Sequence, residues 1–106
     1  MFARSVSIHL KPNSSAAFTK KIENEALPTL RKQDGFQGEL TLLALGGAEA
    51  IAISFWNKKE NADTYARTGY SEVLKNLNNV IEGTPKVQTY EVATSTFQKI
   101  AATVAA

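Results

Sequence analysis

The stretch "SFWNKKENADTYARTGY", residues 54–70, decides the fold. An apolar run ends at Trp56, and a short polar segment separates it from residues of helical composition. Asn57 and Glu60 have the spacing of a capping box, in which two side chains satisfy free backbone N–H groups at the start of a helix. We therefore expect a helix over residues 58–67, and the stretch indicates a strand that passes directly into a helix.

Three aromatic residues mark this junction: Trp56, Tyr65 and Tyr70. Tyr65 falls two turns into the expected helix, and Gly69 interrupts the helical pattern just before Tyr70. Aromatic rings at such a junction can enclose a pocket for an aromatic molecule, or they can simply fill the space between a strand and a helix. Both readings stay open at this point.

Two β-prone runs precede the junction, residues 36–45 and residues 50–56. A Gly46-Gly47 pair lies between them, so the two runs predict an antiparallel hairpin. Each run carries apolar side chains at both odd and even positions. A sheet that is apolar on both faces needs cover on both. This pattern favours a homodimer, because the chain offers no third layer.

The N-terminal residues 2–10 alternate with a period of two, which predicts a strand. A helical pattern over residues 16–32 follows, with a cap expected from Asn13, Ser14 or Ser15, and with Pro28 expected to kink its last turns. One strand face carries Phe2, Arg4, Val6, Ile8 and Leu10, and the other carries Ala3, Ser5, Ser7 and His9. The apolar helix face carries Phe18, Ile22, Ala26 and Leu30, and Gly35 is expected to end the helix in a left-handed conformation.

The C-terminal half predicts a second helix that resumes at Tyr70 and continues to Val80 or Ile81, with Gly83 and Pro85 stopping it. A last strand is expected over residues 86–97. Residues 97–106 could be helical or frayed. The resulting order, β-α-β-β-α-β, predicts an α+β, ferredoxin-like sandwich with an antiparallel sheet and both helices on one face.

Composition limits the classes of protein to consider. The chain has 106 residues, and 43% are hydrophobic and 21% charged, so we expect one globular domain over residues 1–106, with 94–106 as a tail that could contact a partner subunit. There is no Cys, no membrane-spanning run and no signal-peptide pattern, which favours a cytoplasmic protein. The net charge of +2 is dispersed, so no nucleic-acid partner is expected. The lack of a long apolar run argues against a membrane partner.

Four segments follow one another in the chain: "ARSVSIHLKP", "ALPTLRKQDGFQG", "ISFWNKKENADTYA" and "VQTYEV". In this order and spacing, and over roughly residues 1–93, the sequence resembles the antibiotic biosynthesis monooxygenase family of the dimeric α+β barrel superfamily. It implies two ferredoxin-like subunits that join their sheets in a barrel. It also implies a pocket in each subunit between the sheet and the helices.

The resemblance further implies chemistry without a cofactor or a bound metal. Some members are monooxygenases in which a deprotonated quinol- or anthrone-like substrate reduces O₂ itself. Members that degrade haem use a His on the second helical region, and "YSEVLKNLNN" contains none, which disfavours haem degradation. Trp56 matches the family's Trp, and Tyr65 or Tyr70 could supply its phenol. An Asn found before the Trp in some members is absent, since Ala52 and Ser54 stand there.

The candidate catalytic residues are therefore Trp56, Tyr65 and His9. The candidate substrate-binding residues are Trp56, Tyr65, Tyr70 and Phe18. The indole N–H of Trp56 could fix a carbonyl, and His9 could be a general base because its pKa lies near neutrality. Each also has a structural reading, as a junction filler and as an interface His. Arg4 and Arg67 could bind an acidic group, although isolated arginines are typical of surface ion pairs.

Two functions follow from these observations. The first is a dimeric, cofactor-independent monooxygenase, or a related isomerase, that acts on a hydrophobic or aromatic small molecule. The second is a non-catalytic dimer that binds a small hydrophobic ligand or has a stress-related role. The Trp and Tyr pattern favours the enzyme, and the incomplete polar set favours the binding protein.

Overall fold

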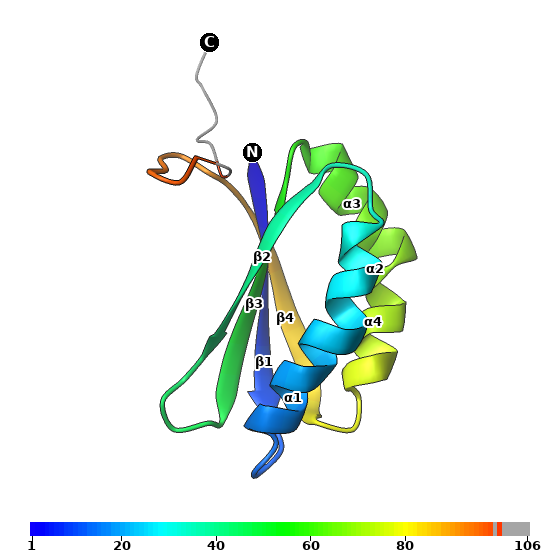
Figure 1. Ribbon diagram of the computed structural model, residues 1–106, viewed down its shortest axis with the longest axis vertical. Helices are drawn as coiled ribbons and strands as arrows, with labels where there is room; N and C mark the ends of the chain where they lie inside the picture. The colour runs from blue at the N-terminus through cyan, green and yellow to red at the C-terminus, as the bar shows by residue number, and fades with distance from the viewer. Residues whose placement is uncertain (99, 101–106) are drawn as a thin grey trace.

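A computed structural model describes residues 1–98 and 100 of the chain. Figure 1 shows one sheet with the helices gathered on one of its faces. This is the α+β, ferredoxin-like order that the sequence predicts. The elements are β1 (Phe2–Leu10), α1 (Ser15–Lys21), a π-helical turn η1 (Ile22–Ala26), α2 (Leu27–Arg31), β2 (Phe36–Leu43), β3 (Glu49–Trp56), α3 (Lys59–Thr68), α4 (Tyr70–Leu77) and β4 (Ile81–Glu91).

The four strands lie in the order β2-β3-β1-β4, and every neighbouring pair is antiparallel. The face of β1 that carries Val6, Ile8 and Leu10 is buried against the helices, as its alternation predicts. Phe18 and Leu30 reach the same core from the first helical region. The helices and this face of the sheet therefore enclose a single hydrophobic core.

The first helical region is continuous but not uniform. At η1 the Leu27 N–H donates to the Ile22 carbonyl, five residues back, instead of four. Pro28 lies in the first turn of α2 and has no N–H to donate, so it cannot complete an α-helical ladder with the preceding turn. The expected loosening therefore takes the form of a π turn just before Pro28. Gly35 has a φ of +78°, which confirms the left-handed conformation expected there.

The capping box expected at Asn57 and Glu60 is wrong. The residue that precedes α3 is Lys58, in an extended conformation, and its side chain makes no capping hydrogen bond. The Asn57 backbone N–H donates to the Gly35 carbonyl at 2.8 Å instead. This bond ties the end of β3 to the loop before β2. Asn57 therefore belongs to the strand end, and the helix begins later than the local pattern suggests.

The boundary between the second helical region and the last strand also differs from expectation. α4 ends at Leu77, and Ile81 starts β4, where it pairs with Leu10 of β1. Gly83 has a φ of +67° and lies where the β1–β4 register shifts, so it forms a bulge within a strand instead of stopping a helix. β4 ends at Glu91, short of the expected residue 97.

The sheet face opposite the helices carries exposed apolar side chains, including those of Leu40, Leu42 and Ile51. Val92, residues 94–97 and Ile100 line a hollow beside Phe55 at one end of the sheet. The remainder of the expected tail, residues 99 and 101–106, lies outside the described residues. Among the described residues, no helix is long and apolar enough to cross a membrane.

Candidate functional site

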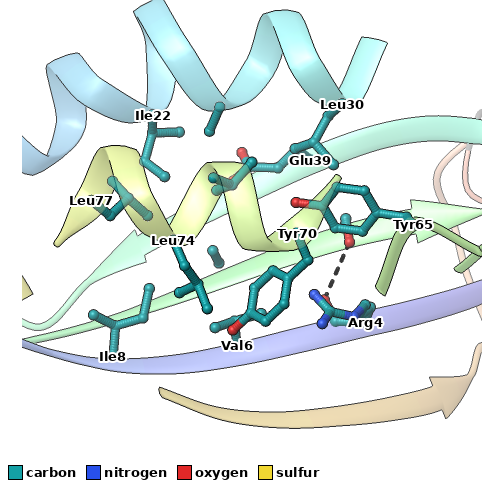
Figure 2. A pocket seen from close by; sticks show the side chains of 14 residues that line it. Arg4, Val6, Ile8, Ile22, Leu30, Glu39, Tyr65, Tyr70, Leu74 and Leu77 are labelled. Carbon is teal, nitrogen blue, oxygen red and sulfur yellow. Dashed lines mark hydrogen bonds between the residues drawn. The ribbon is translucent and has the colours of Figure 1, made fainter. Parts of the chain in front are cut away.

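A cavity lies between the helices and the buried face of the sheet (Figure 2). Its volume is about 40 Å³, which is room for a few water molecules. Most of the wall is aliphatic, and four titratable side chains interrupt it. The lining residues are Arg4, Val6, Ile8, Ile22, Ala26, Leu30, Glu39, Ala52, Ser54, Tyr65, Tyr70, Val73, Leu74 and Leu77.

Arg4 is the cation of this cavity, and it is almost fully buried, with 4% of its surface exposed. Its guanidinium carbon lies 4.0 Å from the ring centroid of Tyr70 and 5.4 Å from that of Tyr65, within cation–π range of both. Within residues 1–98 and 100, the ion pairs involve His9, Lys21 and Lys59, and none involves Arg4. Burial lowers the pKa of Arg4. The site thus holds a desolvated cation without a carboxylate partner.

The two tyrosines of the cavity differ in exposure. Tyr65 of α3 is 3% exposed, and burial raises its pKa to about 12. Tyr70 is the first residue of α4 and is partly buried, and burial raises its pKa as well. Their rings meet edge to face, with centroids 6.1 Å apart. Both phenols therefore remain neutral hydrogen-bond donors at physiological pH.

Glu39 of β2 is the acid of the cavity. The Thr41 hydroxyl donates to its Oε2 atom at 2.6 Å, and burial raises the pKa of the Glu39 carboxyl. In Figure 2, Glu39 lies on the side of the cavity toward which the Tyr65 hydroxyl points. A carboxylate in an apolar wall can exchange a proton with a bound molecule.

Trp56 lies behind this cavity and is not part of its wall. Its ring is fully buried and stacks on Tyr65, with centroids 5.2 Å apart and an interplanar angle of 26°. The indole N–H donates to the Ser54 Oγ atom at 2.8 Å. The Ser54 hydroxyl in turn donates to the Arg4 carbonyl at 3.5 Å (dashed line in Figure 2). The indole N–H of Trp56, which the sequence suggests as a donor to a substrate carbonyl, is therefore already hydrogen-bonded to Ser54.

The other two candidates from the sequence lie away from the cavity. His9, the only His of the chain, is on the opposite face of the sheet, where its side chain is 70% exposed and its Nδ1 lies 3.5 Å from Glu49 Oε1. Phe18 is fully buried in the core but does not line the cavity. The structure therefore brings together Tyr65 and Tyr70 beside Trp56, and it places His9 and Phe18 elsewhere.

The structure adds three polar residues to the candidate site: Arg4, for which the sequence leaves acid binding and a surface ion pair open, and Glu39 and Ser54, which no sequence pattern proposes as site residues. The expectation that Arg4 forms a surface ion pair is wrong, because the side chain is buried. The alternation along residues 2–10 could have indicated this burial, since it places Arg4 on the same strand face as Val6 and Ile8. Among the described residues, no group of three or more His, Asp or Glu side chains could hold a metal ion.

No family model and no curated protein sequence matches the chain. Solved structures do match it. A protein from Bordetella bronchiseptica, named as an antibiotic biosynthesis monooxygenase, has a TM-score of 0.72 and 17% identity over 84% of this chain and 93% of its own.

Two further structures give the same result. A protein from Deinococcus radiodurans with the same name has a TM-score of 0.68 and 18% identity, over 86% of this chain and 91% of its own. A monooxygenase from Streptomyces coelicolor, in complex with the ligand nanaomycin D, has a TM-score of 0.71 and 15% identity, over 84% of each chain. The chain therefore has the ferredoxin-like fold of the antibiotic biosynthesis monooxygenases.

Proposed function

We propose that the protein is a cofactor-independent monooxygenase that oxidises a hydrophobic aromatic molecule in the cavity between its sheet and its helices. The observation that carries this proposal is the composition of the cavity wall. Aliphatic side chains form most of it, and the buried cation of Arg4 and the neutral phenol of Tyr65 face the same space. Apolar walls favour a ring system, and the few polar groups favour an oxygen substituent on it.

The chemistry needs only the substrate and O₂. An anthrone- or quinol-type molecule that loses a proton becomes an electron-rich anion, which can transfer electrons to O₂. For an anthrone, one oxygen atom enters the substrate as a carbonyl and the other leaves as water. The protein then has to favour the anion, and a buried cation beside neutral hydroxyl donors stabilises developing negative charge far better than water does.

The size of the cavity implies that the site opens. A volume of about 40 Å³ is too small for a fused aromatic ring system. Tyr70 and Leu74, on α4, are only partly buried, so they can move outward at lower cost than the fully packed residues beneath them. Substrate entry therefore requires an outward shift at the start of α4.

Homodimer formation is part of this proposal. The exposed apolar side chains of the open sheet face, such as Leu40 and Leu42, would be covered by a second copy of the chain. We also propose that the protein acts in the cytoplasm, since its sequence contains no Cys for disulfides.

A second function is supported by a separate observation, the small volume of the cavity. A cavity of this size suits a protein that binds a small hydrophobic ligand, in a stress-related role or another one, without chemistry. The two functions differ in one measurable respect. Both predict a change in the fluorescence of Trp56, the only Trp of the chain, when a ligand binds, but only the first predicts oxygen consumption.

Oxygen uptake with a panel of anthrones and quinols tests the first function. We expect protein-dependent uptake with at least one member of the panel, and a roughly hundred- to thousandfold loss of rate in Tyr65→Phe, because this change removes one buried donor. Tyr90→Phe is the matched control, because Tyr90 lies on β4, is 50% exposed and does not line the cavity. Fluorescence changes without uptake across the panel would favour the binding protein.

A further inference from the structure

A polar row crosses the floor of the cavity on three adjacent strands. Glu39 of β2 pairs with Ser54 of β3, and Ser54 pairs with Arg4 of β1. Residues that pair directly across strands point to the same face of a sheet. All three line the cavity, so this face is the one that the helices cover. The row is the only interruption that the sheet makes in an otherwise apolar floor within the described residues.

The two ends of the row carry opposite charges that do not neutralise each other. Their backbones are two strand spacings apart, roughly 10 Å, with the small side chain of Ser54 between them. Among the described residues, Arg4 has no ion pair, and the side-chain hydrogen-bond partner of Glu39 is Thr41. A buried cation and a carboxylate that do not satisfy each other are costly in an apolar wall, unless a third group enters between them.

We infer that this row is a proton-abstraction site for a weakly acidic enol or phenol, in which Glu39 takes the acidic proton and Arg4 binds the resulting oxyanion. This inference rests on the proposed function and assigns the base and the anion-binding residue of its first step. The acidic O–H bond, or the C–H bond of the corresponding keto form, breaks in this step. The proton moves to a Glu39 oxygen, and the electron pair stays on the substrate as an enolate or phenolate.

The surroundings of each group suit its role. A raised pKa makes the Glu39 carboxylate a stronger base than one in water, and Thr41 fixes its orientation. Arg4 remains charged, because an arginine keeps its proton even when it is buried. Its cation–π contacts with Tyr65 and Tyr70 hold the guanidinium group in the cavity without supplying a counter-charge.

The helices that cover the row contribute few competing groups. Besides Arg4 and Glu39 themselves, the titratable residues that face the cavity are Tyr65 of α3 and Tyr70 of α4. Both stay neutral, so neither competes with Glu39 for the proton near neutral pH. The first helical region contributes only Ile22, Ala26 and Leu30.

Binding of 4-nitrophenol tests the inference, because the phenol and its phenolate differ in visible absorbance. The titration is made at a pH below the pKa of the free phenol, and proton release is followed with a pH indicator in weak buffer. In the wild-type protein we expect the phenolate spectrum without proton release, because the proton is retained on Glu39. We expect the bound phenolate to be favoured over the phenol about tenfold or more, relative to free solution.

Three variants separate the two roles. Glu39→Gln should still give the phenolate spectrum, but with one proton released per bound molecule. Arg4→Met should bind the ligand as the neutral phenol, with no phenolate band, and Arg4→Lys should recover part of that band. The neutral analogue 4-nitroanisole is the control for folding and cavity shape. The affinity for 4-nitroanisole should be equal within about twofold in the wild-type protein and in Arg4→Met, because this ligand is uncharged and its binding does not need the guanidinium charge.

Several results would overturn the inference. A phenolate band that persists in Arg4→Met would show that Arg4 is not the anion site. Proton release by the wild-type protein equal to that of Glu39→Gln would show that Glu39 does not take the proton. Failure of the wild-type protein to bind 4-nitrophenol would contradict it as well. None of these readouts needs turnover, so oxygen uptake without the spectral change would remove the inference and leave the proposed function intact.

Discussion

Ser54 links the two halves of the site at the level of single residues. Its Oγ accepts the indole N–H of Trp56 at 2.8 Å, and both residues are buried. Ser54→Ala leaves that N–H without its acceptor, so we expect a loss of about 1–3 kcal/mol in the free energy of unfolding. Urea denaturation, followed by the fluorescence of Trp56, measures it. Ser7→Ala, at an exposed position of the same sheet, should change stability by less than about 0.5 kcal/mol, and equal effects of the two substitutions would contradict this account.

The ionisation of Tyr65 makes the stability of the protein depend on pH. Its pKa is about 12 in the folded state and 10.0 in the unfolded chain, so the unfolded state loses its proton first as the pH rises. The stabilisation is fully present below pH 10 and is lost as the pH approaches 12. We expect the wild-type protein to lose roughly 2–3 kcal/mol more stability over this range than Tyr65→Phe does. Denaturation curves across this pH range provide the measurement, and Tyr90→Phe should behave like the wild-type protein.

Gly69 lies between α3 and α4, where neighbouring side chains leave little room for a larger residue. A Cβ atom placed there would lie 3.0 Å from the Tyr65 ring and 3.2 Å from Gln33 Nε2. The φ of Gly69 is −95°, so backbone strain does not require glycine. Glycine is required by the close packing of the Tyr65 ring against the helix junction. The element boundary therefore holds in place the aromatic ring that separates Trp56 from the cavity.

Gly69→Ala should displace the Tyr65 ring from Trp56. We expect altered Trp56 fluorescence and at least a severalfold weaker affinity for 4-nitroanisole. The net loss of stability should be small, because overpacking of about 1–3 kcal/mol is partly offset by the better helix propensity of Ala. Gly46→Ala is the matched control, since a Cβ atom at Gly46 meets nothing within 4 Å. Unchanged fluorescence and affinity in Gly69→Ala would contradict this role of the junction.

At the scale of the whole molecule, the open face of the sheet is the principal unexplained surface. Leu42 is 49% exposed and Ile51 is 39% exposed, and these two residues pair directly on neighbouring strands. The proposed dimer would bury both. We expect light scattering to give the mass of a dimer for the wild-type protein and of a monomer for Leu42→Glu, because an unpaired carboxylate would enter an apolar interface.

Leu45→Glu is the control for this prediction. Leu45 is fully exposed and lies in the β2–β3 turn, away from the sheet face, so its substitution should leave the dimer unchanged. Circular dichroism of both variants should show a folded α+β protein. A wild-type monomer at micromolar concentration would contradict the proposed dimer.

Local patterns predict the sheet and its buried face, because the alternation along residues 2–10 is a property of the strand itself. They fail at Ile81, where helical spacing and a strand start are both compatible with the sequence. Pairing with Leu10, 71 positions earlier in the chain, decides between them. Helix capping at Asn57 fails for a similar reason, since its backbone N–H bonds to the distant Gly35.

The candidate site divides in the same way. Tyr65 and Tyr70 follow from the junction pattern, and the burial of Arg4 could have been inferred from its phase on β1. Glu39 could not, because it joins the site only through the register of β2 on β3 and of β3 on β1. Nothing in its own segment distinguishes it from an exposed carboxylate.

We expect the cavity between the sheet and the helices to receive an aromatic small molecule. Titration of the ¹⁵N-labelled protein with 2-naphthol, followed by amide chemical shifts, tests this most directly. We predict the largest shifts around Arg4 and Ser54 on the sheet and around Tyr65 and Tyr70 on the helices. Shifts confined to the open sheet face around Leu42, or no shifts at all, would contradict the claim.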